Sequence, residues 1–306
     1  MAFGIRTGRQ RAIDALNAAS EVVETAVGPV EYALRGDAPY VVIFHGTPQS
    51  HHASFIGEPM EAAGFGTITP SRPGFLRTPL ETGPSFEEQA DAVAALLDAL
   101  EVGQVAGYAI SGGGPSGIQF AARHPDRVRA LILEVAITQR YEPEVSDLMV
   151  KVSMSSFVQW LSSVIMKRFP RVGVAQFLAM ESTLEAMDRA RVVDDILADP
   201  EKMAVLENLI VQSPPMDLLR AGFDNDLKRF REIDQLPLDQ VRCPTLLAYG
   251  THDGDVPFSH AENAAQGIPN AELFAVENGW HLLALSDGDG AYLEAEIDFL
   301  REHLVR

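Results

Sequence analysis

Cysteine and lysine are scarce in this chain of 306 residues. Its single cysteine, Cys243, has no partner for an internal disulfide, so nothing suggests a disulfide-stapled secreted scaffold. Only four of the 24 basic residues are lysines, while 43 acidic residues leave a formal net charge of −19. A nucleic-acid-binding surface needs clustered Lys and Arg, which this composition does not favour. We therefore expect no nucleic-acid partner.

Long apolar runs are also absent from the sequence. No stretch reaches the roughly 18 uninterrupted apolar residues that cross a bilayer. Residues 1–11 include Arg6, Arg9 and Arg11, but no apolar segment typical of a secretion signal follows them. We expect a soluble, cytoplasmic protein with no membrane partner. With 46% hydrophobic residues, the chain is long enough to form one large domain with a substantial core.

Short β-branched and aromatic segments alternate with helical segments in the two outer parts of the chain. Residues 21–34 are typical of a hairpin, and the run YVVIF at 40–44 is typical of a strand buried on both faces. This alternation predicts a mainly parallel sheet between helices. The other predicted strands are 66–70, 104–110, 128–136, 245–250 and 272–276, and the predicted helices are 8–19, 85–100, 114–123, 259–266 and 291–303.

The strand signals stop in the middle of the chain. Residues 138–238 show helical spacing interrupted by several prolines, and the strand pattern returns at residue 245. We therefore expect one α/β core, formed by residues 1–137 and 239–306, with a helical insertion at 138–238.

A glycine-rich turn between a predicted strand and a predicted helix carries Ser111. Residues 105–127 read VAGYAISGGGPSGIQFAARHPDR. Small residues on both sides of such a serine allow the strained strand–turn–helix backbone that exposes a nucleophile. Gly113 is one small neighbour, and Ala109 stands where a first glycine is usual. A register with Gly107 as first glycine and Ala109 at the nucleophile position remains an alternative.

The same glycine run has a second interpretation, as a phosphate-binding loop. The sequence lacks the G-K-[ST] that completes a P-loop, and it lacks G-x-G-x-x-G with an acidic ribose partner. We therefore disfavour a nucleotide site.

A serine nucleophile needs a base, and His281 is the candidate. It follows the last predicted strand in the segment NGWH, while Asp253 follows the preceding strand in GTHDGDVP. An acid there can hold the imidazole and stabilise its charged form. Asp255 and Glu134 remain alternative acids. Six other histidines fit ordinary loop or helix positions: His51, His52, His124, His252, His260 and His303.

Two backbone N–H groups are expected to bind the oxyanion of acyl transfer. Gly112, directly after the nucleophile, supplies one. The turn HGTP after the strand at 40–44 presents Thr47, which is expected to supply the other. By itself HGTP predicts only a turn; together with Ser111 it becomes an oxyanion-hole candidate.

Several motifs in this order resemble the α/β-hydrolase superfamily, and most closely its bacterial branch with HGTP and SGGGP. They are HGTPQS, SRPGF at 71–75, AISGGGP, GTHDGDVP and NGWH. The resemblance implies a doubly wound, mostly parallel eight-stranded sheet, a triad of Ser111, Asp253 and His281, and a helical cap at about 138–238. Dehalogenases and epoxide hydrolases of this fold use an aspartate nucleophile, so a serine at position 111 disfavours both chemistries.

Methionine and aromatic residues gather in the predicted cap. Flexible thioethers and aromatic rings form adaptable apolar walls, although each such residue taken singly fits the cap's own core better. We expect a roofed apolar pocket whose lining includes His45, Met154, Phe157, Trp160 and Trp280.

These observations together predict a serine carboxylic-ester hydrolase that works through an acyl-enzyme. We expect small to medium, apolar or aromatic ester substrates, no metal or organic cofactor, and a monomer or homodimer. A C–C bond hydrolase or a lactonase would use the same triad, because the discriminating contacts lie in the cap and loops. A receptor-like binding module without turnover is the alternative from a different class.

Overall fold

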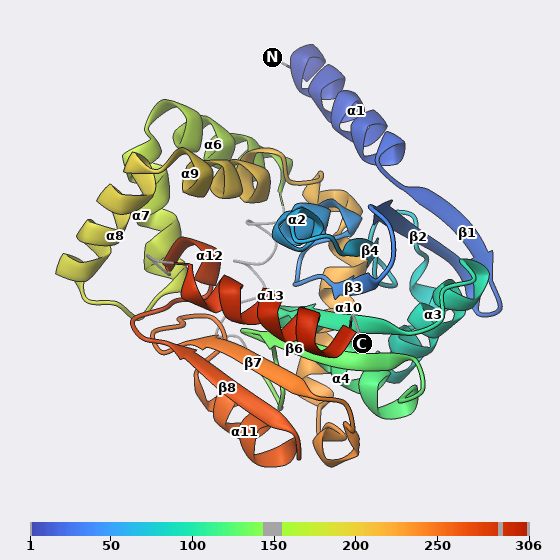
Figure 1. Ribbon diagram of the computed structural model, residues 1–306. Helices are drawn as coiled ribbons and strands as arrows, with labels where there is room; N and C mark the ends of the chain where they lie inside the picture. The colour runs from blue at the N-terminus through green and yellow to red at the C-terminus, as the bar shows by residue number, and fades with distance from the viewer. Residues whose placement is uncertain (1, 143–154, 287–289, 305–306) are drawn as a thin grey trace.

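The computed structural model describes residues 2–142, 155–286 and 290–304 and contains one eight-stranded sheet (Figure 1). The strand order is β1-β2-β4-β3-β5-β6-β7-β8, and β3 to β8 run parallel. β2 pairs antiparallel with both β1 and β4. The predicted fold is thus confirmed. The strands are β1 (Glu21–Thr25), β2 (Gly28–Arg35), β3 (Tyr40–Phe44), β4 (Gly66–Pro70), β5 (Val105–Ile110), β6 (Val128–Glu134), β7 (Thr245–Gly250) and β8 (Ala271–Val276).

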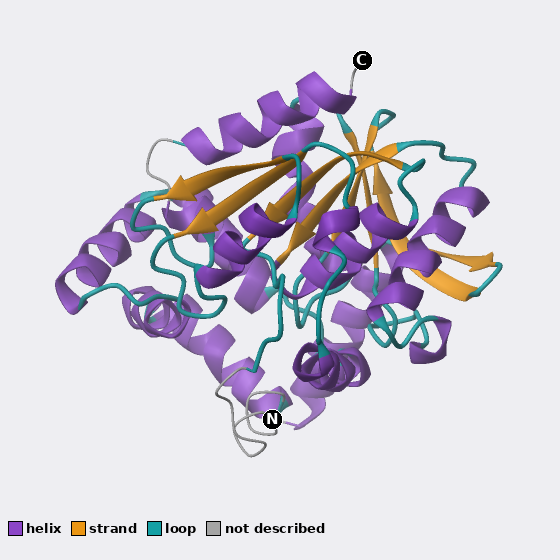
Figure 2. Ribbon diagram, turned by 90° about the horizontal axis from the view of Figure 1, so that it is seen from below, coloured by secondary structure: helices purple, strands orange, loops and turns teal. Residues whose placement is uncertain are grey.

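Both faces of the central strands are buried. Along β3, Val42 and Phe44 join one apolar cluster while Val41 and Ile43 join another, because successive side chains of a strand point to opposite faces. Helices cover each side of the sheet (Figure 2). The first cluster includes α3 (Phe86–Ala99), α4 (Gly114–Arg123) and α11 (Ser259–Gly267), and the second includes α2 (Glu58–Ala62) and α13 (Ala291–Leu304).

The predicted hairpin forms as β1 and β2, at the edge of the sheet. Helix α3 begins at a capping box in which Ser85 accepts from the Glu88 N–H, and the Glu88 carboxylate accepts from the Ser85 N–H. The largest shifts of expected element boundaries are at α1 (Ala2–Ala18), which begins six residues before the predicted position 8, and at β6, which ends at Glu134 instead of residue 136.

Helices occupy the described chain between β6 and β7, as the sequence predicts. They are α6 (Ser156–Arg168), α7 (Pro170–Glu181), α8 (Ala186–Ala198), α9 (Pro200–Leu206) and α10 (Arg220–Glu232). Pro170 and Pro200 are the first residues of their helices, where the missing N–H has no intrahelical partner to lose. These prolines therefore mark helix starts. The exact boundary of the cap, at 138–238, remains a prediction.

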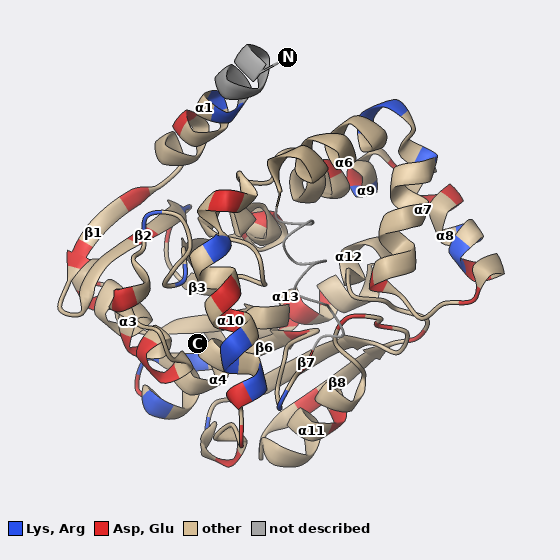
Figure 3. Cartoon of the chain, turned by 180° about the vertical axis from the view of Figure 1, so that it is seen from behind, with Lys and Arg blue, Asp and Glu red and all other residues tan. Residues whose placement is uncertain are grey.

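The described helices include none that is both long enough and apolar enough to cross a membrane. Acidic and basic residues lie interspersed along the chain in the view of Figure 3.

Candidate active site

Ser111 lies at a sharp turn at the carboxyl edge of the sheet. It directly follows β5 and has a φ of 51°, a left-handed conformation that is uncommon for a residue with a side chain. Its carbonyl accepts from the Ile137 N–H at 3.0 Å, which secures the turn against the chain that leaves β6. A Cβ at Gly113 would lie 2.1 Å from the Phe44 carbonyl oxygen, so only glycine fits there.

Ala109, which stands where a glycine is usual before the turn, packs against a glycine of helix α4. Ala109 lies within β5, and a Cβ built on Gly117 of α4 would lie only 2.5 Å from the Ala109 methyl. Gly117 thus makes room for the side chain that replaces the usual first glycine. Because Ala109 is inside the strand, the structure places Ser111, not Ala109, at the turn.

Ser111, His281 and Asp253 form one hydrogen-bonded line. The Ser111 Oγ lies 3.0 Å from His281 Nε2, and the His281 Nδ1 lies 2.8 Å from Asp253 Oδ2. The other oxygen of Asp253 accepts from the backbone N–H groups of Asp255 and Val256, both at 2.8 Å. These donors hold the carboxylate so that it orients the imidazole with Nδ1–H toward the acid and Nε2 toward the hydroxyl.

The loops after β7 and β8 bring the acid and the base together. The Thr251 N–H donates to the Val276 carbonyl, and the His252 N–H donates to the Gly279 carbonyl at 2.7 Å. A Cβ at Gly250 would lie 2.4 Å from the backbone of Gly279, so the two loops touch at their bases.

The end of helix α7 fastens these loops to the helical segment. The Glu181 carbonyl accepts from the Gly254 N–H at 3.1 Å and from the His281 N–H at 3.3 Å. Ser182 forms a β-bridge with Asp253, and the Thr183 N–H donates to the His252 carbonyl. Backbone from the expected cap therefore contacts the acid loop and the base loop directly.

The two alternative acids occupy different places. Glu134 ends β6 and is buried, and burial raises its pKa to about 8, against the attraction of His281. Asp255 lies near the imidazole, but its Oδ2 is 3.5 Å from Nε2, the nitrogen that faces Ser111. The hydrogen bond to Nδ1 comes from Asp253.

The electrostatic surroundings of His281 favour its charged form. Burial lowers the pKa of the imidazole, but attraction to Asp253, Asp255 and Glu181 outweighs burial, so the pKa is raised. Ligand atoms of Glu181, Asp255 and His281 lie within 4.8 Å of one another, close enough to hold a metal ion.

Removing one of these charges is expected to make the imidazole easier to deprotonate. With Asp255→Asn, the titration midpoint of His281 should fall by about one pH unit, because a nearby carboxylate stabilises the imidazolium. NMR of protein labelled in its histidine rings measures this, with His281→Gln identifying the resonance. Asp298→Asn, which removes an exposed acid paired with Arg301, is the control. An unchanged midpoint for Asp255→Asn would show that Asp255 does not act on the ring.

Thr47 and Gly112 lie side by side next to Ser111. A Cβ at Gly112 would lie 2.3 Å from Thr47 Oγ1, and a Cβ at Gly46 would lie 3.2 Å from Ser111 Cβ. Within the described residues, the N–H groups of Thr47 and Gly112 make no hydrogen bond. Both donors are therefore available beside the hydroxyl.

A buried ion pair forms hydrogen bonds with the loop that carries Thr47. Arg72, in the loop after β4, donates 3.0 Å and 2.7 Å hydrogen bonds to the two carboxylate oxygens of Asp226 on α10. It also donates to the His45 carbonyl and to Thr47 Oγ1, and the Thr47 hydroxyl donates to Asp226. Neither charged side chain is more than 1% exposed. The pair thereby links the sheet, the Thr47 loop and helix α10.

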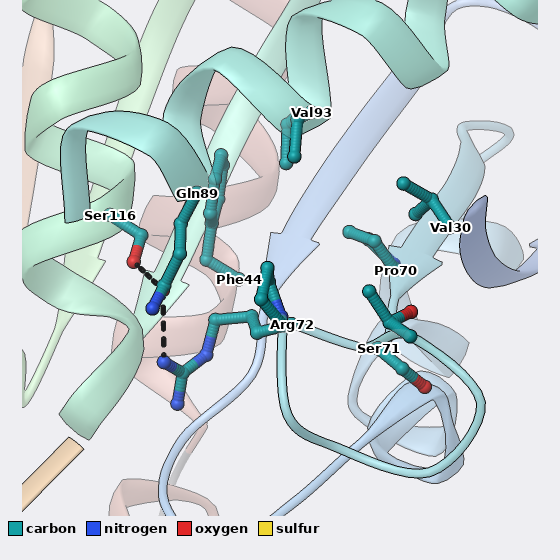
Figure 4. Close-up of a pocket in the computed structure, with 11 residues that line it drawn as sticks. Val30, Phe44, Pro70, Ser71, Arg72, Gln89, Val93 and Ser116 are labelled. Carbon is teal, nitrogen blue, oxygen red and sulfur yellow. Dashed lines mark hydrogen bonds between the residues drawn. The ribbon is translucent and has the colours of Figure 1, made fainter. Parts of the chain in front are cut away.

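Gln89 extends this network into the core. Its Oε1 accepts from Ser116 Oγ at 2.6 Å and from Arg72 Nη1 at 3.3 Å (Figure 4). A cavity of about 10 Å³, enough for about one water molecule, lies beside these residues. The guanidinium is held from several sides, which fixes its position behind Thr47.

Two residues expected in the substrate pocket are fully buried. His45 and Trp280 have no exposed surface. Nδ1 of His45 contacts the Gly46 carbonyl at 2.8 Å and Nε2 accepts from the Arg72 N–H, while burial and then Arg72 hold its pKa well below the usual range. Trp280 packs edge-on against Phe177 of α7. Their assignment to a pocket lining therefore stays a prediction.

The other expected pocket residues lie in the helical segment. Phe157 and Trp160 are 66% and 42% exposed on α6, with ring centroids 5.9 Å apart. Met154 lies outside the described residues. The expectation that α6 contributes to a pocket remains a prediction.

Sequence analysis missed three residues near the site. Arg72 stands in the motif SRPGF, but no pattern there indicates its partner. Asp226 is an ordinary acid of a charged helix, 154 positions away from Arg72. Glu181 ends a helix without any local signal. The one local signal was the pair of motifs HGTP and SRPGF, which could have suggested that the loops carrying Thr47 and Arg72 meet.

Comparison with known proteins finds a family model and a solved structure that both match the fold described above. Residues 39–287 match the family model described as the alpha/beta hydrolase fold. A solved alpha/beta hydrolase fold protein from Nakamurella multipartita superposes with a TM-score of 0.86 at 35% identity, covering 92% of this chain and 99% of that one.

Curated relatives include proteins of more than one reaction class. An uncharacterized hydrolase of Bacillus subtilis is 28% identical, over 84% of this chain and 90% of its own length. A pimeloyl-[acyl-carrier protein] methyl ester esterase of Chromobacterium violaceum is 30% identical, over 88% and 95%. A 2-hydroxy-6-oxononadienedioate/2-hydroxy-6-oxononatrienedioate hydrolase of Dechloromonas aromatica is 26% identical, over 79% and 78%.

Proposed function

Because this chain belongs to the alpha/beta-hydrolase family, we propose that it is a serine hydrolase of carboxylic esters that works through an acyl-enzyme. The observation that carries the proposal is the hydrogen-bonded line from Ser111 through His281 to Asp253. The line ends on a serine in a strained turn beside two available N–H donors. This combination matches the needs of acyl transfer.

The proposed reaction has two halves. His281 Nε2 takes the Ser111 proton while the oxygen attacks the ester carbonyl, and the N–H groups of Thr47 and Gly112 bind the oxyanion. The tetrahedral intermediate collapses as the same Nε2 gives the proton to the leaving alcohol. Water, deprotonated by His281, then attacks the acyl-enzyme and releases the carboxylic acid and the free serine. Asp253 stabilises the imidazolium in both halves.

Small to medium, apolar or aromatic esters are the proposed substrates. Support comes from the apolar composition of the helical segment and from the resemblance to a methyl ester esterase. The alternative is hydrolysis of a C–C bond, favoured by the resemblance to the Dechloromonas enzyme. Both chemistries use the same three side chains, so substrate tests must separate them.

The test combines turnover with active-site labelling. p-Nitrophenyl esters with acyl chains from C2 to C12 should be hydrolysed, with an optimum among the shorter chains, because we expect a roofed apolar pocket. A fluorophosphonate should add one group per chain and abolish turnover, since only an activated serine attacks phosphorus readily. Peptide mapping should place the adduct on Ser111.

Three results would contradict the proposal. The first is turnover that survives complete labelling of Ser111. The second is an adduct on another serine. The third is folded protein that hydrolyses no member of the ester series, which would favour a C–C hydrolase or a binding module.

A further inference from the structure

Two carboxylates beside the imidazole have no part in the proposed proton transfer. Asp255 Oδ2 lies 3.5 Å from His281 Nε2, the nitrogen that also contacts Ser111 Oγ. Oxygen and nitrogen atoms of Glu181, Asp255 and His281 lie within 4.8 Å of one another. Negative charge therefore lies close to the reacting atoms, in addition to that of Asp253.

The surrounding structure holds the Asp255 carboxylate and the backbone of Glu181 in place. The Tyr141 hydroxyl donates to Asp255 Oδ1 at 2.6 Å, and the Asp255 N–H donates to Asp253. Glu181 is the last residue of α7, and its carbonyl accepts from the backbone of Gly254 and His281. Their positions thus follow from the packing of the helical segment on the loops after β7 and β8.

No lysine or arginine of the described chain neutralises these two acids. Among the described residues, the cation that pairs with Asp255 is His281, and Glu181 has no ion pair with a basic residue. Arg72, the buried arginine behind Thr47, is already paired with Asp226. The side of the imidazole that faces Ser111 therefore carries an excess of negative charge.

The proposed mechanism places one part of the substrate next to this charge. His281 Nε2 must come within hydrogen-bonding distance of the leaving alcohol oxygen to protonate it. Because Asp255 Oδ2 approaches the same nitrogen, the alcohol portion of the ester leaves beside Asp255 and Glu181, while the oxyanion lies at Thr47 and Gly112.

We propose that Asp255 and Glu181 select esters by the charge of the alcohol portion, favouring a cationic alcohol over a neutral one and disfavouring an anionic one. This inference rests on the proposed ester hydrolysis. A charge on the acyl portion, which lies away from the leaving group, has a weaker effect. The electrostatic interaction between a charge on the substrate's alcohol portion and these carboxylates acts over several ångströms near the protein surface. It corresponds to about a tenfold change in kcat/KM for each unit of substrate charge.

Three butyrate esters of similar size test the inference. Butyrylcholine carries a fixed positive charge, 3,3-dimethylbutyl butyrate is its neutral isostere, and 2-sulfoethyl butyrate carries a fixed negative charge. Hydrolysis is followed by acid release at pH 8.5. Burial, the main cause, raises the pKa of Glu181 to about 7, so this carboxyl is ionised at that pH. The expected order is cationic, neutral, anionic, with about tenfold between neighbours.

Variants assign the selectivity to the two carboxylates. Asp255→Asn and Glu181→Gln should each reduce the ratio of kcat/KM for butyrylcholine to that for the sulfonate, and the double variant should bring it within about threefold of one. Asp298→Asn should leave the ratio at its wild-type value. Ethyl 4-(trimethylammonio)butanoate and its neutral isostere, ethyl 5,5-dimethylhexanoate, should differ by less than about threefold.

The outcomes separate this inference from the proposed function. Hydrolysis of the neutral ester reports the proposed function, and its absence in folded protein counts against that function and this inference together. Hydrolysis of all three alcohol esters at equal rates overturns the inference alone. So does a selectivity that both carboxylate variants leave unchanged, or one that is equally strong when the charge lies on the acyl side.

Discussion

Ser111→Ala is expected to lower kcat for p-nitrophenyl esters by about 10⁴- to 10⁶-fold while the protein stays folded. The substitution removes the hydroxyl that lies 3.0 Å from His281 Nε2 and leaves the two candidate oxyanion donors in place. Binding and the donors alone account for the residual rate. Steady-state kinetics measures the loss, and circular dichroism checks the fold.

His281→Ala should cause a loss of similar size, and the double variant should be hardly worse than either single one. The reason is that nucleophile and base act as one unit, so removing either disables the other. Ser286→Ala is the matched control and should retain activity, because this hydroxyl of the nearby helix α12 (Leu283–Ser286) bonds, within the described chain, to backbone carbonyls alone. Losses that simply multiply in the double variant would speak against a shared step.

Asp226→Asn is expected to lower the free energy of unfolding by about 3 kcal/mol, because it leaves the buried Arg72 charge without its anionic partner. It should also reduce kcat, since Asp226 and Arg72 together hold the Thr47 side chain. Denaturant titration gives the stability change, and ester kinetics gives the catalytic change.

The neighbouring surface pair of the same helix is the control for this prediction. Asp224 accepts hydrogen bonds from Arg220, and both side chains are at least 40% exposed. Asp224→Asn should therefore cost less than about 1 kcal/mol. The double variant Arg72→Met Asp226→Leu should recover stability without recovering kcat. Equal stability of Asp224→Asn and Asp226→Asn would contradict the role given to the buried pair.

Much of the architecture follows from local patterns in the sequence. The run YVVIF forms β3, buried on both faces, and the helix predicted at 85–100 forms as α3. The loss of strand signals after residue 138 corresponds to helices in the described part of that segment. Such features depend on residues close together in the chain, where periodicity acts directly.

The sequence by itself also singled out Ser111, Asp253 and His281, because parallel strands end at the same edge of the sheet and their following loops meet there. Only the tertiary structure decided what surrounds them. Asp226 lies 154 positions from Arg72, and no spacing rule relates two such residues. Likewise, Glu181 reaches the imidazole only because α7 packs on the loops after β7 and β8. Contacts of this kind depend on how helices pack across the sheet edge, a property of the assembled chain that no short segment encodes.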